Sequence, residues 1–250
     1  TEDTMQLVLL NAVLNQLQSL KKESPKLFLK ALICMDLNLK VDTLSVESVQ
    51  ILEQVVAHIE KNPVDILHLG ITVIPENGVS EAEAEGFGSF INQQSHFTQG
   101  EEVLRTIYDE GYGQKLDWRT TQRLYRGELF RSAFAEMTSE RLVRAEDAYE
   151  VFVLSDKAQT ADGFESCRGL LYHYGIGVTG ASRISMDQFG QFCYQFLDNI
   201  DQTELYIGKT DNVAYLRAFE GMKHKLMELL IGDWKSRLAP EDQELGLEPF

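Results

Sequence analysis

Apolar residues recur at helical spacing over most of the chain. The two longest runs begin at Phe189 and at Tyr215, where large apolar side chains follow one another at intervals of three and four residues. This spacing gives a helix one apolar face, which packs against other helices. The runs and the polar residues that precede them predict helices over residues 4–22, 25–38, 45–61, 79–94, 99–110, 117–137, 139–155, 162–174, 186–200 and 211–234.

Four pairs of polar residues have the spacing of a capping box, in which a side chain and a backbone amide satisfy each other across the first turn of a helix. Each pair therefore predicts a helix start. The pairs are Ser80 with Glu83, Thr98 with Glu101, Ser185 with Gln188, and Asp201 with Glu204.

One segment has the composition of a strand. Residues 64–74 are rich in β-branched side chains and alternate between apolar and other residues. Residues 32–37 and 151–154 are further strand candidates. We therefore expect a mainly α fold, either a multi-helix bundle or an array of helical hairpins, with a small parallel β element within residues 27–74. An α/β fold is the alternative.

The basic residues change type along the chain, which suggests a boundary between two regions. Residues 1–100 contain six lysines and no arginine, whereas arginines predominate from 101 to 183. We expect an N-terminal helical or α/β region over residues 1–96, a C-terminal helical region over 97–238 and an acidic tail over 239–250. One continuous domain is the alternative.

The net charge of −16 limits the partners that the protein can have. Phosphate backbones repel such a surface, so general nucleic-acid binding is not expected, whereas basic protein partners are favoured. No apolar run approaches the roughly 18 residues that span a bilayer, and the acidic N-terminus differs from a signal peptide. We expect a cytoplasmic protein that does not insert into membranes.

No pattern in the chain is typical of a metal site or of a catalytic group. The three cysteines lie far apart within apolar segments, and the histidines are scattered. The glycine-serine-glycine turn of hydrolases, the phosphate-binding loop of nucleotide hydrolases and the paired-histidine motif of zinc proteases are all missing. We predict no metal, no cofactor and no catalytic residue, although residues distant in sequence can still assemble a catalytic site.

Three glycines match a motif of dinucleotide-binding folds. Gly175, Gly177 and Gly180 have the GxGxxG spacing, which lets a strand turn tightly into a helix that holds a pyrophosphate. Here residues 162–174 are predicted to be helical, and the next helix begins only after Ser185. A turn between two helices is therefore the favoured interpretation, and a ligand-binding loop at these glycines is the alternative.

The segment 117–137 combines basic and aromatic residues on one side of a predicted helix. Arg119, Arg123 and Arg126 share a face, which Phe130 and Phe134 continue toward the C-terminus. A helix that enters the core, with its arginines paired to acidic residues elsewhere, explains this pattern without any function. The alternative is a partner-binding surface, because arginine and aromatic residues are enriched at interfaces.

These observations favour a non-catalytic protein–protein interaction module, such as an adaptor, chaperone or regulatory subunit that acts through helical surfaces. The alternative is an enzyme, or a protein that binds a nucleotide or another small ligand near the glycines at 175–180. Self-assembly into homo-oligomers also stays open.

Overall fold

The computed structural model describes residues 46–93, 96–112, 116–120, 122–176, 183–208 and 210–243. Within these residues the strands form one four-stranded sheet in the order β2-β4-β1-β3. The strands are β1 (Ile66–Pro75), β2 (Thr98–Gln99), β3 (Arg123–Tyr125) and β4 (Thr160–Tyr174). The helices are α3 (Val46–Lys61), α4 (Glu81–Ile91), α5 (Glu101–Tyr108), α6 (Gly127–Glu136), α7 (Glu146–Lys157), α8 (Met186–Ile207), α9 (Val213–Ser236) and α10 (Pro240–Gln243), with a short 3-10 helix η2 (Glu110–Tyr112) after α5.

The sheet is mixed, and this overturns the expectation of a mainly α, all-helical bundle. β1 runs parallel to β4 and antiparallel to β3, while β2 is antiparallel to β4. The fold is α/β. The strand predicted over residues 64–74 is confirmed as β1, but its parallel partner is β4 rather than a segment before residue 64. The second strand candidate, 151–154, lies inside helix α7, and residues 32–37 lie outside the described residues.

β4 occupies the segment for which the sequence predicts a helix over 162–174. Leu69 pairs with Phe164, but Gly70 pairs with Arg168 and Ile71 with Leu170, so β4 carries extra residues at two irregularities. Such bulges break the two-residue alternation of a strand. The apolar residues on either side of the bulges consequently fall at intervals that resemble those of a helix.

The long helix predicted over 117–137 is also wrong. Helix α6 begins only at Gly127, and the preceding residues form a loop and strand β3. In this loop the Asp117 carboxylate accepts a hydrogen bond from the Arg119 backbone amide (3.1 Å), and the guanidinium of Arg123 donates to the carbonyl oxygens of Asp117 and Arg119. These local side-chain contacts compete with the hydrogen bonds of a helix.

Five predicted helices are confirmed as α3, α4, α5, α8 and α9, and the helix predicted over 139–155 is confirmed in its second half as α7, which begins at Glu146. Two of the four capping boxes are formed, at Ser80 before α4 and at Ser185 before α8. The N-cap of α5 is Gly100 rather than Thr98, and Asp201 with Glu204 lies within α8 rather than at a helix start. The predicted helices over 4–22 and 25–38 lie outside the described residues.

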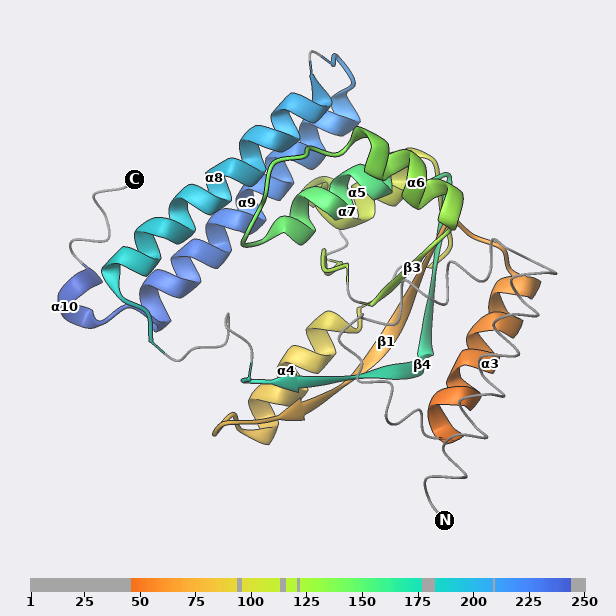
Figure 1. Cartoon of the computed structure of the whole chain (residues 1–250), viewed down its shortest axis with the longest axis horizontal. Helices are drawn as coiled ribbons and strands as arrows, with labels where there is room; N and C mark the ends of the chain where they lie inside the picture. The colour runs from red at the N-terminus through yellow and green to blue at the C-terminus, as the bar shows by residue number, and fades with distance from the viewer. Residues whose placement is uncertain are drawn as a thin grey trace.

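The elements are arranged in a sheet part and a helical part. In Figure 1 the strands run between α3 and α4, and the remaining long helices gather at one end of the sheet. Helix α3 covers a smaller apolar core on the sheet, whereas the larger core lies among α5, α6, α7, α8 and α9. Because β1 and β4 pair with each other, strands from either side of position 96 share one sheet. The division into regions at 96 stays a prediction.

Among the described residues, no helix combines the length and the apolar character that crossing a bilayer requires.

Candidate functional site

Helices α8 and α9 form a hairpin whose outward side carries exposed apolar residues. On α8 the side chain of Tyr194 is 72% exposed, that of Leu197 52% and that of Leu205 72%. These residues follow one another at intervals of three and eight, which places them on one side of the helix. We call the outward side of the hairpin the outer face, and its exposed apolar residues are Tyr194, Leu197, Leu205, Val213, Leu216, Met227 and Ile231.

The opposite sides of both helices are buried, which fixes the direction of the outer face. Phe189 and Phe196 of α8, and Met222 and Leu226 of α9, are among the least exposed side chains of the larger core. α8 packs against α7 and α9, and α9 packs against α5. The helices behind the hairpin therefore leave its outer face uncovered by any described element.

Close contacts hold the hairpin in place. Gly221 brings the backbone of α9 against the carbonyl group of Tyr108 at the end of α5, so closely that a Cβ atom at this position would lie 2.8 Å from the carbonyl carbon. Between the two helices, the Thr203 hydroxyl lies 3.5 Å from the sulfur of Met222. At the start of α9, Asn212 caps the helix by accepting a hydrogen bond from the Ala214 amide (2.9 Å).

The far ends of the hairpin are anchored by buried charges. The Asp233 carboxylate of α9 accepts from Arg144 (2.5 Å) and from Arg237 (2.7 Å). The Arg144 guanidinium also lies over the ring of Phe192 in α8, 3.8 Å from its centroid. Burial lowers the pKa of Arg144, and the nearby Asp233 carboxylate opposes this effect. This cluster ties the segment before α7 to both helices of the hairpin.

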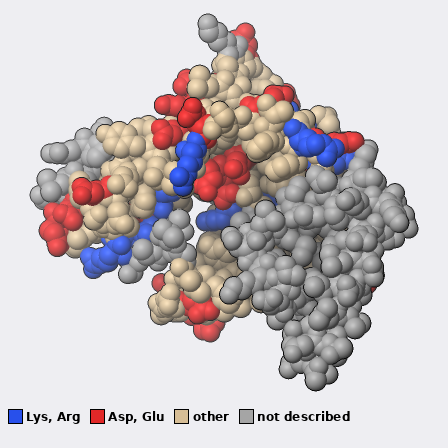
Figure 2. All heavy atoms as spheres, in the orientation of Figure 1, with Lys and Arg blue, Asp and Glu red and all other residues tan. Residues whose placement is uncertain are grey.

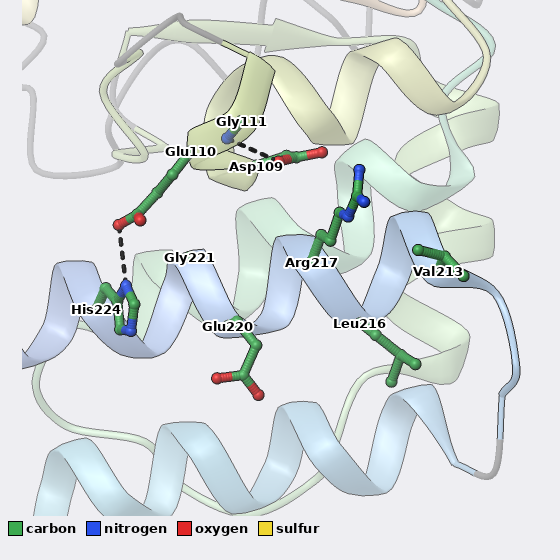
Figure 3. Close-up of a pocket in the computed structure, with 9 residues that line it drawn as sticks. All are labelled: Asp109, Glu110, Gly111, Val213, Leu216, Arg217, Glu220, Gly221 and His224. Atoms are coloured by element: carbon green, nitrogen blue, oxygen red, sulfur yellow. Dashed lines mark hydrogen bonds and ion pairs between the residues drawn. The ribbon is translucent and has the colours of Figure 1, made fainter.

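A shallow groove of about 380 Å³ adjoins the outer face along α9 (Figure 3). Val213 and Leu216 belong to both surfaces, while Arg217 and His224 supply polar groups. His224 lies 3.1 Å from the Glu110 carboxylate across the groove. The groove therefore extends the apolar surface with charged groups of both signs.

A carboxyl group with an unusual pKa lies at the start of α7. Burial and the neighbouring carboxylates of Asp147 and Glu146 raise the pKa of Glu150 to about 7. Asp147 itself accepts hydrogen bonds from the backbone amide (3.2 Å) and the hydroxyl of Thr120. These contacts join α7 to the loop before β3 and hold the Asp147 carboxylate beside Glu150.

The structure separates the arginines and aromatic residues that the sequence places on one helix. Arg119 pairs with Asp117 in the loop, and its guanidinium lies over the ring of Phe87 (5.3 Å). Arg123 is 4% exposed in β3, which removes it from the surface.

The remaining three residues of that prediction lie around α6. Arg126 precedes this helix and binds Asp65 (3.0 Å), and Phe130 stacks on Phe134 within it (6.0 Å between ring centroids). Phe134 is 66% exposed, so it alone of the five residues presents a large apolar surface to solvent. The continuous basic and aromatic face that the sequence predicts is not formed.

Gly175 directly follows β4 and begins a turn, while Gly177 and Gly180 lie outside the described residues. Gly175 has a φ of +108°, and a Cβ atom there would lie 2.6 Å from the carbonyl oxygen of Glu76. The close approach of the two strand ends therefore explains this glycine. A strand does precede the motif, contrary to the sequence prediction, but α8 begins only at Met186 and its first turn is capped by Ser185.

The outer face was not predicted from the sequence, although the sequence contains a pattern that indicates it. Val213, Leu216, Met227 and Ile231 fall outside the apolar stripe that faces the core. Large apolar residues out of phase with the buried stripe of a helix indicate a second contact surface.

The described residues contain no group of three or more His, Cys, Asp or Glu side chains that could hold a metal ion. Comparison of the chain with known protein families, curated proteins and solved structures finds no match.

Proposed function

We propose that the protein is a protein–protein interaction module that binds its partner through the outer face of the α8–α9 hairpin. One observation supports this proposal above the others: seven large apolar side chains of two adjacent helices are exposed, and on each helix their spacing places them along one side. Single exposed apolar residues are ordinary on protein surfaces, but contiguous patches mark sites of association.

The construction of the hairpin favours binding over a role in the fold. Both helices already bury one complete apolar side in the core, so the second apolar side contributes nothing to that packing. The buried anchors at Gly221 and Asp233 hold the backbone of the hairpin firmly. A surface that is rigid before it binds loses little conformational entropy on association.

The test compares polar substitutions at two exposed leucine sites. Leu197→Gln together with Leu205→Gln removes apolar surface from the outer face without altering charge or strongly affecting helix propensity. Leu171→Gln is the matched control, because Leu171 is 64% exposed on β4, away from the hairpin. The chain is isolated from its native host, and partners that co-purify in stoichiometric amounts are identified and quantified.

We expect the double variant to lose the partner and the control to retain it. Burying a leucine contributes about 1.5–3 kcal/mol when it is complete, so two partly buried leucines are worth roughly 2–4 kcal/mol. This corresponds to a Kd that is weaker by roughly 30- to 700-fold. A partner that binds the double variant and the wild-type chain equally well contradicts the proposal.

A further inference from the structure

The carboxylates of α8 are not used in ion pairs within the described fold. α8 contains four carboxylates, Asp187, Asp198, Asp201 and Glu204, and neither lysine nor arginine. All four are exposed, and none of them forms an ion pair with another described residue.

Three of these carboxylates are placed where they disfavour the helix itself. Asp198, Asp201 and Glu204 follow one another at intervals of three residues, so neighbouring like charges repel along the helix. Glu204 also lies in the last turn, where the helix dipole disfavours negative charge. The fold gains nothing from this arrangement, which therefore indicates a role in contact with another molecule.

The same three carboxylates lie among the exposed apolar residues of α8. Asp201 follows Leu197 by four residues and precedes Leu205 by four, so all three share one side of the helix. In Figure 2, acidic side chains gather over the C-terminal half of α8. On α9 the charge is balanced instead, since Lys223 binds Glu220 at 2.5 Å. Along α8 the outer face thus combines apolar residues with unpaired carboxylates, whereas along α9 it is apolar with balanced charge.

We infer that the partner presents an amphipathic helix whose apolar stripe is flanked by lysine or arginine. This inference rests on the proposed function. A helix fits the long surface of a two-helix hairpin, where its apolar stripe covers the exposed leucines and tyrosine. Its basic flank then meets the unpaired carboxylates of α8, which sets its orientation and speeds its association.

The negative charge of the outer face argues against three other binding partners, namely a second copy of this chain, a nucleic acid and an anionic lipid surface. A second copy of this chain, docked by the same face, would bring its own acidic α8 near the first one, and each copy carries a net charge of −16. Nucleic acids and anionic lipid surfaces are repelled by the same carboxylates.

The test uses two synthetic helical peptides of about 18 residues, long enough to form a helix on the surface. Both have the same leucine stripe, and their polar positions are lysine in one and glutamate in the other. Binding to the full chain is measured by calorimetric titration. The test variant is Asp198→Asn, Asp201→Asn and Glu204→Gln. The control variant is Glu53→Gln, Glu85→Gln and Glu140→Gln, which removes three exposed carboxylates from other elements.

We expect the lysine peptide to bind the wild-type chain and the control variant with Kd values within about twofold of each other, because both keep the α8 carboxylates. Binding to the test variant should weaken by about tenfold, as three exposed ion pairs are lost. The glutamate peptide should bind none of the chains. The double leucine variant, whose charge is unchanged, should also lose the lysine peptide.

Different failures exclude different claims. Equal weakening in the two triple variants would show only general attraction to an acidic protein and would overturn the inference of a basic helix. Equal binding of the two peptides, or no binding of the lysine peptide, would also overturn the inference of a basic helix. In each of these cases the proposed docking face would still be tested separately by co-purification of the partner. If the double leucine variant binds the lysine peptide as the wild-type chain does, both the inference and the apolar docking face are wrong.

Discussion

The contact between α9 and α5 offers a sharp test of the packing that orients the outer face. In Gly221→Ala the new Cβ atom would overlap the carbonyl oxygen of Tyr108, which belongs to the backbone and cannot rotate away. Tyr108 is itself held in the core, since its hydroxyl donates to the carbonyl oxygen of Ala148 (2.7 Å). The helices must therefore separate for the alanine to fit.

The expected magnitude follows from this geometry. Overfilling a packed core costs about 1–3 kcal/mol, and a clash between two backbones belongs at the upper end of that range. For a chain of this size, about 3 kcal/mol lowers Tm by roughly 6–12 °C.

A second glycine on the same helix is the matched control. A Cβ atom at Gly232 would meet no other atom within 4 Å. Gly232→Ala should therefore stabilise α9 by about 0.5–1 kcal/mol, because alanine is the better helix former. Thermal unfolding followed by circular dichroism measures both variants. If Gly221→Ala shifts Tm upward as Gly232→Ala does, α9 does not lie against Tyr108.

Two further variants test contacts that hold the fold. Glu150 has a pKa of about 7 in the folded chain against its usual 4.5. Between these pH values the folded chain keeps a proton that the unfolded chain loses. The free energy of unfolding therefore falls as the pH rises through this range. After allowance for partial exposure, Glu150→Gln should be more stable than the wild-type chain by about 1–2 kcal/mol at pH 8, with the difference shrinking as the pH falls and vanishing only below about pH 4 in urea titrations; a difference independent of pH would contradict this pKa. Asp65→Ala removes the partner of Arg126 and the acceptor of the Gln159 amide (2.9 Å), and it should cost about 2–3 kcal/mol in the same titrations. An unchanged free energy of unfolding would show that these contacts are not formed.

Much of the helical part could be predicted from the sequence, because the residues that define each helix lie close together along the chain. The buried stripes of α8 and α9 repeat over several turns, and Ser185 with Gln188 marks the start of α8. β1 was also predictable, since β-branched residues and alternation agree there. In these segments the residues that decide the structure lie within a few turns of one another.

The failures lie where distant residues decide the structure. The spacing of apolar residues in β4 follows from its irregular pairing with β1, which no single segment reveals. The loop before β3 is held by Asp147, 27 residues beyond Thr120 along the chain. Arg123 was expected at the surface because the sequence predicts a helix over the loop before β3. Its burial depends on the carbonyl groups of this loop, which the sequence does not reveal.

The outer face lies between these two cases. Its residues belong to helices that the sequence predicts well, and Leu197 even forms part of the apolar run beginning at Phe189. Which apolar residues of a helix face the core and which face solvent depends on the positions of α5 and α7, and these come only from the assembled fold.

The most direct test of the central claim is the Kd of the co-purified partner, measured for chains altered at three surfaces. These are Leu197→Gln with Leu205→Gln on the outer face, Leu171→Gln on β4, and Phe134→Gln on α6. Phe134 is one of the residues that the sequence predicts to bind a partner. The account predicts that only the first variant weakens binding, by roughly 30- to 700-fold. A partner that is lost with Phe134→Gln and retained by the leucine pair would contradict it.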